Sequence, residues 1–371
     1  MKVLVCIPCL MTGGTEIQTL SLVEALITVG HEVCVACYFE HTESMVERYR
    51  EAGAEIVLMS PDGSRPTGVL NIAKFLLKGL RSIVKSFRPD VAHIQYMNPG
   101  ALPVLILKLL GVGKLVATTH TDADIYSRNC LRIIRILSST CLTAFQCITE
   151  RAERSYFGSS ILFDGKLSRH FTIYNNIPSH ISILENLRPV KAETAPVIVG
   201  VVSRLEHIKG MDLVVPAFAK AYRQNHRLRL LVVGDGSQRQ LMEQQVAREG
   251  LNDAVEFAGR QPQSELQPYY DRIDVLLMPS RSEGFGLTAI EGMARGCVPI
   301  VADVGGLPEV VTLDCGRLHK SESVDDLWHR ILEIVSDPKT LATLSDNAIV
   351  RAMAFSTDNY RHQIKEWYNT L

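Results

Sequence analysis

The chain has 371 residues, 46% of them hydrophobic, and a formal net charge of −1. This length exceeds one ordinary hydrophobic core and predicts two domains of similar size. A near-neutral charge gives no global attraction to nucleic acid, so we expect no nucleic-acid partner and only local anion binding.

The first element in chain order is the apolar run at residues 3–8. A secretory signal is the alternative, but only Lys2 precedes the run and Pro8 interrupts it. The apolar stretch 101–117 is broken by Lys108 and Lys114, which makes it a poor membrane span. We therefore interpret residues 3–8 as a strand and expect a cytoplasmic protein, with the inner face of the membrane as an open location.

Two Cys-x-x-Cys pairs occur near the N-terminus, at Cys6 and Cys9 and at Cys34 and Cys37. Zinc or redox chemistry is one interpretation. However, the second pair lies in a strand-like run, where positions three apart point to opposite faces. Buried reduced thiols are the interpretation that the pattern favours.

Strand-like runs alternate with amphipathic helical runs along the whole chain. Strands are predicted at residues 3–8, 32–38, 54–59, 91–95, 115–119, 143–148 and 171–174, and again at 197–203, 228–233, 254–257, 274–278 and 298–301. Such alternation implies right-handed crossovers and parallel sheets covered on both faces. We expect an α/β protein of two doubly wound, Rossmann-like domains that face each other across a cleft.

The joint between the domains is predicted in the polar, proline-containing segment 182–196, after which the alternation restarts. We place an N-terminal, acceptor-side domain at 1–186 and a donor-binding domain at 187–354. The helix at about 355–371 is a candidate to pack back on the N-terminal domain.

The stretch "SRSEGFGLTAIEGMARGCVP", residues 280–299, carries the strongest signal for chemistry. Gly284 and Gly286 let the backbone approach a ligand, and the first amides of the helix that follows form a site for a phosphate. Glu283 precedes that site and Glu291 lies one turn into the helix. Such a pair can hold both ends of a sugar–phosphate–nucleoside, although two solvated glutamates are the alternative.

Further anion-binding elements lie at the ends of other predicted strands. Arg204 and Lys209 follow the strand at 197–203, and two cations there suit a diphosphate. Gly13 and Gly14 follow the first strand and open a helix, which is a second anion-binding turn. Each of these elements is weak evidence by itself.

Taken together, Gly13-Gly14, "SRLEHIKG" and "EGFGLTAIEGMARGCVPIVA" resemble the retaining glycosyltransferases of family 4, the glycosyl transferases group 1, which have the GT-B fold. The resemblance spans nearly the whole chain, and the paired-glutamate motif is its most specific part. Gly292 departs from the family pattern, in which alanine is usual at this helical position.

The resemblance implies a role for each matching residue. Arg204 and Lys209 would hold the leaving diphosphate, Glu283 would contact the donor sugar, and Glu291 would bind the ribose hydroxyls. His120, at the end of a strand, would face the sugar from the acceptor side. The remaining donor-binding positions are Gly13, Gly14, Arg260, Gln261, Leu266, Gly284, Phe285, Gly286, Leu287 and Thr288.

The activity implied is transfer of a hexosyl or N-acetylhexosaminyl group, with retention, from a nucleotide sugar to a sugar, lipid-linked or polysaccharide-precursor acceptor in cell-envelope glycan synthesis. A UDP-sugar is favoured from family frequency only, and no cofactor is expected. The alternatives are a nucleotide-sugar epimerase of the same fold and a non-catalytic protein that binds nucleotide sugars.

Two surface features leave alternatives open. Asp122-Ala123-Asp124 resembles a metal-binding D-x-D, but we expect no metal, because one of the aspartates is better placed to cap the following helix. Arg128, Arg132 and Arg135 follow it, and Lys74, Lys78, Arg81 and Lys85 form one face of an earlier helix. A solvated face is one interpretation; peripheral contact with an anionic membrane is the other.

Overall fold

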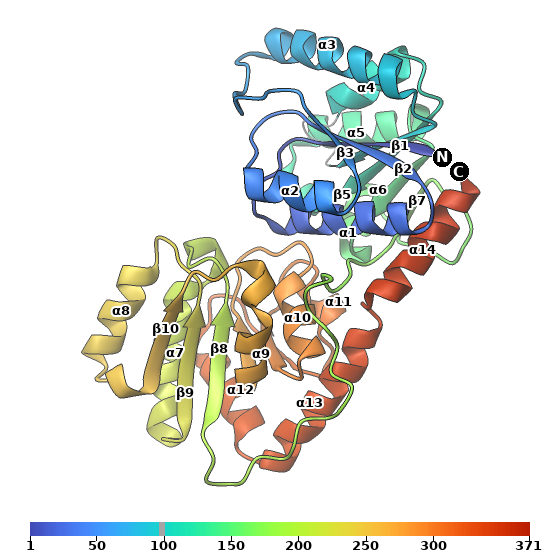
Figure 1. The fold of residues 1–371 in the computed structure, drawn as a ribbon. Helices are drawn as coiled ribbons and strands as arrows, with labels where there is room; N and C mark the ends of the chain where they lie inside the picture. Colours follow the sequence, from blue (N-terminus) through green and yellow to red (C-terminus); the bar gives the residue numbers. More distant parts are fainter. Residues whose placement is uncertain (96–100) are drawn as a thin grey trace. The chain divides into compact units, whose positions relative to one another are not determined.

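The structure is a computed structural model that describes residues 1–95 and 101–371 (Figure 1). The chain divides into two compact units. The N-terminal unit comprises Met1–Asn176 together with Thr357–Leu371, and the C-terminal unit comprises Ile177–Ser356.

The N-terminal unit is built on a parallel sheet of seven strands in the order β3-β2-β1-β4-β5-β6-β7. The strands are β1 (Lys2–Ile7), β2 (Glu32–Cys37), β3 (Glu55–Leu58), β4 (Val91–Gln95), β5 (Lys114–Thr119), β6 (Ala144–Cys147) and β7 (His170–Thr172). The helices are α1 (Gly14–Thr28), α2 (Glu43–Glu51), α3 (Val69–Phe87), α4 (Ala101–Leu109), α5 (Arg128–Thr140), α6 (Glu150–Phe157) and α14 (Thr357–Thr370).

Two apolar layers cover this sheet because strand side chains alternate between its faces. Val3, Val5 and Ile7 of β1 pack in one cluster with residues of α1, α2 and α14. Leu4 and Cys6 of the same strand pack in the other with residues of α3, α4, α5 and α6. The helices therefore form a layer on each face of the sheet.

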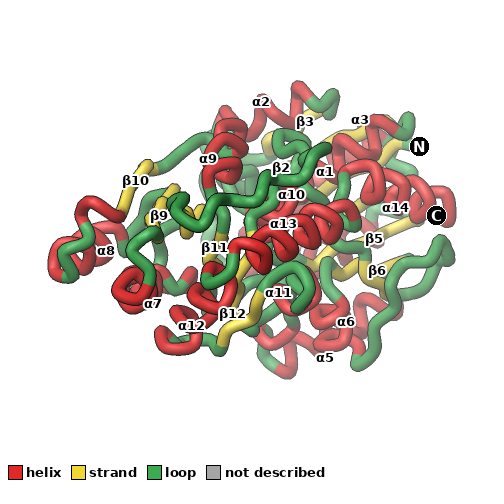
Figure 2. The backbone as a smooth tube through the Cα atoms, turned by 90° about the horizontal axis from the view of Figure 1, so that it is seen from below, coloured by secondary structure: helices red, strands yellow, loops and turns green. Residues whose placement is uncertain are grey.

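The C-terminal unit repeats the design with a parallel sheet of six strands in the order β10-β9-β8-β11-β12-β13. The strands are β8 (Val197–Val202), β9 (Leu228–Val233), β10 (Val255–Gly259), β11 (Val275–Met278), β12 (Val298–Ala302) and β13 (Arg317–His319). The helices are α7 (Met211–Gln224), α8 (Arg239–Arg248), α9 (Gln267–Arg272), α10 (Leu287–Ala294), α11 (Leu307–Val310), α12 (Val324–Val335) and α13 (Pro338–Met353). Figure 2 colours these helices red and the strands yellow.

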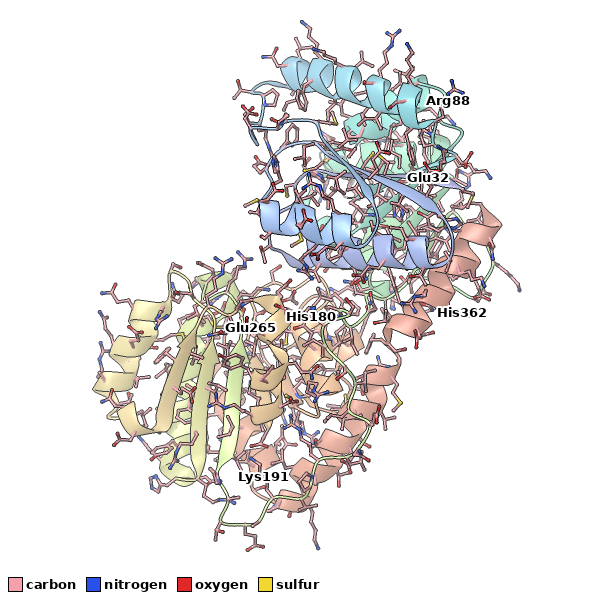
Figure 3. All side chains as sticks on the ribbon, in the orientation of Figure 1. Glu32, Arg88, His180, Lys191, Glu265 and His362 are labelled. Carbon is pink, nitrogen blue, oxygen red and sulfur yellow. The ribbon has the colours of Figure 1, made fainter. Side chains whose placement is uncertain are left out.

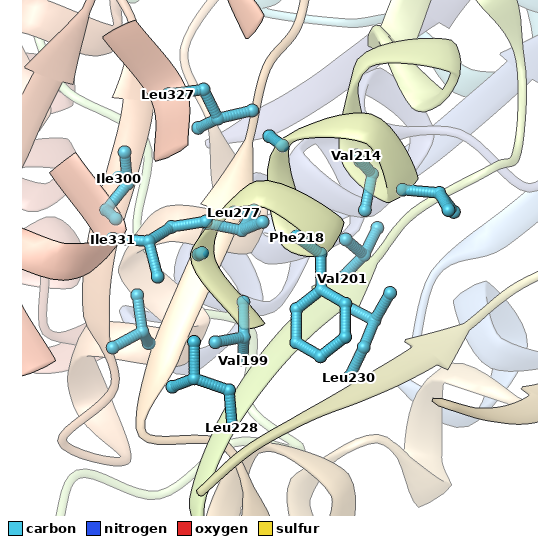
Figure 4. Packing of buried hydrophobic residues seen from close by; sticks show 14 of the residues in the cluster. Val199, Val201, Val214, Phe218, Leu228, Leu230, Leu277, Ile300, Leu327 and Ile331 are labelled. Carbon is cyan, nitrogen blue, oxygen red and sulfur yellow. The ribbon is translucent and has the colours of Figure 1, made fainter. Parts of the chain in front are cut away.

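The core of the C-terminal unit forms where the amphipathic helices α7 and α12 cover β8, β9 and β11 (Figure 4). Phe218 of α7 is fully buried and lies among Val199, Val201 and Leu230. This rigid layer fixes the strand ends from which the functional loops begin.

These sheets confirm the predicted α/β class with two doubly wound, Rossmann-like domains. The strand β13 was missed, because Arg317 and His319 leave Leu318 as the one apolar residue among its three positions. The units also divide after residue 176, ten residues before the predicted boundary. The reason is that residues 177–196 are bonded to the C-terminal unit, for example from Leu184 N to Ala294 O at 2.9 Å.

Segment 182–196 runs along the end of the C-terminal unit where the strands begin. Arg188 donates to the carbonyls of Tyr270 and Ile273, and Lys191 pairs with Asp274 at 2.5 Å. Figure 3 shows Lys191 at the opposite end of this unit from Glu265. Within residues 1–95 and 101–371, none of the helices combines the length and the apolar character that crossing a bilayer requires.

Candidate functional site

The central pair of strands in the C-terminal unit, β8 and β11, marks the point where the strand order reverses. The chain leaves β8 toward β9 on one side and continues from β11 toward β12 on the other. The loops that follow β8 and β11 therefore diverge and leave room between them, which is where ligands bind in open α/β sheets. These loops are residues 203–210 and 279–286.

The two loops are joined by an ion pair between Lys209 and Glu283. Lys209 Nζ lies 2.6 Å from Glu283 Oε2, and the two side chains are 21% and 17% exposed. Lys209 ends a short 3₁₀ turn, His207–Lys209, just before α7. The pair is thus half-buried at the strand-order reversal, and the charged ends remain within reach of a ligand.

Arg281 also joins the same two loops. Its amide donates to Ile208 O at 2.9 Å, and its guanidinium binds both oxygens of Asp212 at 2.7 and 2.9 Å. A second carboxylate, Glu322, accepts at 2.5 and 2.8 Å. Hydrogen bonding to Asp212 raises the pKa of Arg281 above its already high usual value. Sequence reasoning missed this residue, since nothing in its spacing distinguishes it from a solvated arginine.

Gly305, after β12, lies against the backbone of Glu283. It has φ of +54°, and a Cβ at this position would overlap the carbonyl oxygen of Glu283. The next amide, Gly306 N, donates to that same oxygen at 3.2 Å. Only glycine allows the loop after β12 to approach the loop after β11 so closely. In the sequence, the Gly305-Gly306 pair after a predicted strand was the signal that could have revealed this contact.

The start of α10 has the geometry that the sequence predicted. Gly286 precedes the helix with φ of +102°, and a Cβ there would lie 2.5 Å from Leu307. The first intrahelical bond runs from Ala289 N to Gly286 O at 2.9 Å. The amides of Leu287 and Thr288 precede that bond and have no intrahelical acceptor, so they are available to an anion.

Buried contacts hold this helix start in place. Phe285 is 3% exposed and stacks edge-on against Phe355 at 5.7 Å between ring centroids. Farther along α10, a Cβ on Gly292 would lie 2.5 Å from Leu276 of β11. The glycine that departs from the family pattern therefore lets α10 pack closely on its strand.

Glu291 is buried, with 5% of its surface exposed, and its Oε2 accepts from the Tyr270 hydroxyl at 2.6 Å. Burial raises the pKa of Glu291 above its usual value, while the bond from Tyr270 opposes that rise. The alternative of two solvated glutamates is therefore wrong for this member of the pair. Tyr270 is a second residue that the sequence did not reveal.

The other donor-side residues lie on loops at the same edge of the sheet. Arg204 is exposed immediately after β8, and the following Glu206 binds Ser237 through its Oε2 at 2.5 Å. Arg260 is exposed after β10, and Gln261 Nε2 donates to Ala258 O at 2.7 Å. The remaining predicted residues, Gly284 and Leu266, lie between β11 and α10 and at the start of α9. All of them follow the carboxyl ends of strands.

In the N-terminal unit, His120 follows β5 and is 7% exposed. Its Nε2 lies 2.8 Å from Gln95 Oε1 at the end of β4. The carboxamide oxygen can only accept, so Nε2 carries the proton and Nδ1 is an acceptor. Burial lowers the pKa of His120 to about 3, and the imidazole is neutral near pH 7.

The Gly13-Gly14 turn opens α1 as predicted, but a carboxylate of the chain already lies beside it. A Cβ on Gly13 would lie 2.5 Å from Glu16 Oε2, and Cys9 donates to Glu16 Oε1 at 3.2 Å. This negative charge opposes a phosphate at the turn, and the role of Gly13 and Gly14 in donor binding stays a prediction.

The predicted cap from the D-x-D segment is wrong. Ser127 caps α5 by accepting from Cys130 N, whereas Asp122 makes an ion pair with Arg151 at 3.2 Å. Among the described residues, no group of three His, Cys, Asp or Glu side chains could hold a metal ion. Nine cysteines are free. Burial raises the pKa of Cys34 to about 12 and that of Cys37 to about 11. Both thiols therefore stay protonated near pH 7 and are poor nucleophiles.

Comparison with known proteins agrees with this fold. The family model described as "Glycosyltransferase Family 4" matches residues 12–155, and that described as "Glycosyl transferases group 1" matches residues 184–351. The first match covers β2 to β6 of the N-terminal sheet, and the second covers all six strands of the C-terminal sheet. The chain belongs to glycosyltransferase family 4.

Relatives of this family 4 protein include two D-inositol 3-phosphate glycosyltransferases. That of Segniliparus rotundus is 32% identical over 43% of this chain and 36% of its own length. That of Kribbella flavida is 28% identical over 72% of this chain and 68% of its own length. The crystal structure of Anabaena HepE in complex with UDP-glucose matches with a TM-score of 0.79 and 18% identity, over 100% of both chains. That likeness shows the GT-B fold.

Proposed function

We propose that this family 4 protein transfers a hexosyl or N-acetylhexosaminyl group from a nucleoside-diphosphate sugar to a glycan or lipid-linked acceptor, with retention of configuration. One observation carries the proposal. The half-buried pair of Lys209 and Glu283, 2.6 Å apart, lies where the strand order reverses, and the loop that carries Glu283 leads into the first amides of α10. In this proposal a cation, a carboxylate and two amides act on one ligand.

The cations and the helix start suit a diphosphate leaving group. Negative charge grows on the leaving oxygen as the bond to the sugar breaks, and fixed positive groups stabilise that charge without reorganising. Lys209 and the exposed Arg204 supply full charges, and the amides of Leu287 and Thr288 add partial ones. A diphosphate neutralised in this way leaves without a general acid.

Glu283 has two tasks in this scheme. Its carboxylate orients Lys209, as the ion pair shows, and its second oxygen, Oε1, is proposed to accept a hydrogen bond from a hydroxyl of the donor sugar. Arg281 and Gly305 keep the backbone of residue 283 in place. The loop is therefore preorganised, which lowers the cost of ordering it around the donor.

The nucleoside end of the donor is proposed to bind beyond the diphosphate. Glu291 would accept from the ribose hydroxyls while Tyr270 holds its other oxygen. Arg260, Gln261 and Leu266 would lie near the base, for which uracil is favoured, since Anabaena HepE was solved with UDP-glucose. In the N-terminal unit we assign the neutral His120 a hydrogen bond to the sugar. An acceptor in cell-envelope glycan synthesis and a location at the inner face of the membrane remain part of the proposal.

A donor panel tests the proposed activity. The protein is incubated with UDP-, GDP- and ADP-sugars, with and without sugar and lipid-linked acceptors, and released nucleotide is measured. Acceptor-dependent release, with a product of unchanged anomeric configuration by NMR, is expected. An epimerase would convert the donor without an acceptor, and a binding protein would release nothing. Lys220, which pairs with Asp325 on another surface of the same unit, provides the control substitution, Lys220→Ala.

A further inference from the structure

Three helices of the N-terminal unit, α3, α4 and α5, lie side by side over one face of its sheet (Figure 1). Each helix buries one stripe of apolar residues against the strands, including Leu80 of α3, Leu107 of α4 and Leu137 of α5. The sides of the three helices that point away from the sheet form one surface, called the α3–α5 face.

The α3–α5 face has a one-sided charge. Residues 69–149 contain ten Lys or Arg and three Asp, and α3, α4 and α5 themselves contain no acidic residue. The whole chain, by contrast, has a net charge of −1. Within the described part of the chain, no ion pair involves Lys74, Lys78, Arg81, Lys85, Lys108, Arg128 or Arg132. These charges are therefore available to an outside partner.

Apolar side chains lie exposed among these cations. Twenty large hydrophobic residues of the described chain are exposed, and eight of them belong to α3, α4, α5 or the 3₁₀ turn before α5. Leu70 is 78% exposed, Leu109 84%, and Ile133 and Ile136 are 53% each. Scattered exposed leucines need no explanation, but a concentration of them on neighbouring helices marks an interaction surface.

The apolar and basic residues share the outward side of each helix. On α3 the exposed stripe follows helical spacing and consists of Leu70, Lys74, Leu77, Lys78, Arg81 and Lys85. On α4 it consists of Leu105, Lys108 and Leu109, and on α5 it includes Arg128, Arg132, Ile133 and Ile136. Arg135 is the exception, since its guanidinium binds the carbonyls of Ser155 and Tyr156.

We propose that the α3–α5 face binds the surface of a bilayer that contains anionic phospholipid. Cations on long, flexible side chains attract lipid phosphates, while leucine and isoleucine between them enter the boundary between headgroups and acyl chains. A second copy of the chain fits this face poorly, because a symmetric contact would place like charges together. Nucleic acid would leave the aliphatic side chains without an apolar environment.

Vesicle sedimentation tests the proposal, and it measures binding without any need for turnover. The full chain is mixed with vesicles of phosphatidylcholine alone or of phosphatidylcholine with phosphatidylglycerol. Binding is expected to the second only, and to weaken as salt screens the charges. Replacing Lys74, Lys78, Arg81 and Lys85 by Gln should lower binding at least roughly tenfold, since each cation near an anionic surface contributes to attraction.

Two further variants separate the effect of this face from the effect of total charge, and the apolar contribution from the electrostatic one. The control variant removes four positive charges outside the α3–α5 face and should leave vesicle binding unchanged. It carries glutamine at the exposed residues Lys166, Arg248, Lys339 and Lys365. Leu105→Ser with Leu109→Ser should abolish the binding that remains at high salt. Equal sedimentation of the wild type and the α3 variant would overturn the proposal, as would equal binding to both vesicle types. Loss of a concentration-dependent dimer in the α3 variant would assign the face to self-association instead. Failure of sugar transfer would leave these outcomes unaffected.

Discussion

Lys209 and Glu283 lie 74 residues apart in the sequence, yet Lys209 Nζ is 2.6 Å from Glu283 Oε2. The ion pair exists because β8 and β11 are neighbours in the sheet. It joins the two sequence motifs that the family resemblance singled out, and it shows that Lys209 contacts the glutamate loop.

The first prediction concerns the chemical step. Lys209→Ala should lower kcat by about 10²–10³, by analogy with loss of one oxyanion donor, because its attraction to the leaving oxygen grows as the sugar bond breaks. The KM for the donor should rise less. Steady-state kinetics with saturating acceptor measures both, with Lys220→Ala as the control. If the substitution raises KM and leaves kcat near that of the wild type, Lys209 binds the ground state and the transition state equally and does not accelerate the chemical step.

Glu291 is predicted to bind ribose, and Tyr270 allows that role to be separated from folding. Glu291→Ala should weaken nucleotide binding by about 1.5–3 kcal/mol, the usual value of a hydrogen bond to a charged group. Tyr270→Phe removes the 2.6 Å bond to Glu291 but leaves the carboxylate, so it should lower the melting temperature with a smaller loss of affinity. Calorimetric titration decides. Unchanged affinity in Glu291→Ala would make the residue structural only.

Burial of Glu291 also predicts a pH dependence of stability. Because its pKa is raised from 4.5 in the folded state, ionisation costs more there than in the unfolded chain. The stabilisation of the folded form by the bound proton is present below pH 4.5 and declines as the pH rises through the folded-state pKa. Glu291→Gln, which does not ionise, should therefore gain stability relative to wild type over that window. Denaturant unfolding at several pH values measures the difference.

Two buried histidines, His93 and His120, should make the folded state less stable as the pH falls. Burial lowers the pKa of His93 and of His120 to about 3, from 6.5 when exposed. Their contribution to stability is complete above pH 6.5 and is lost as the pH falls toward 3, since the unfolded chain binds protons first. His93→Gln should flatten the curve between these limits. Because the pKa of His120 is about 3, its protonation should not lower kcat near pH 6.5.

Gly305 is predicted to fix the Glu283 loop. Gly305→Ala must adopt φ of +54° and also displace the Glu283 carbonyl, so it should destabilise the fold and lower kcat. Gly158→Ala is the matched control: it has φ of +82° with no atom within 4 Å of the new Cβ. It should cost only about 1–2 kcal/mol of backbone strain and leave kcat intact. Equal effects of the two substitutions would remove the supporting role of Gly305.

Activity is also predicted to survive a chelator, because Arg204, Lys209 and the start of α10 already supply positive charge for the diphosphate. Nucleotide release is measured with and without EDTA. Complete loss, restored by manganese, would contradict this and direct attention to Asp122 and Asp124.

The sequence by itself determined the fold class and most strands, since strands of a parallel sheet that is covered on both faces are rich in apolar residues, as β1, β8 and β11 are. It also identified Glu283, Arg204 and Lys209 as candidates, because glycine turns and strand ends are local features. The paired-glutamate motif needed no knowledge of distant contacts.

Tertiary structure alone decided which of these residues meet and which are buried. The partner of Glu291 is Tyr270, the partner of His120 is Gln95, and the Gly13 turn lies against Glu16. The physical reason is that strand order sets the neighbours. A sheet in the order β10-β9-β8-β11-β12-β13 brings the loops after β8 and β11 together, and hydrogen bonds across such loops leave no periodic trace in the sequence.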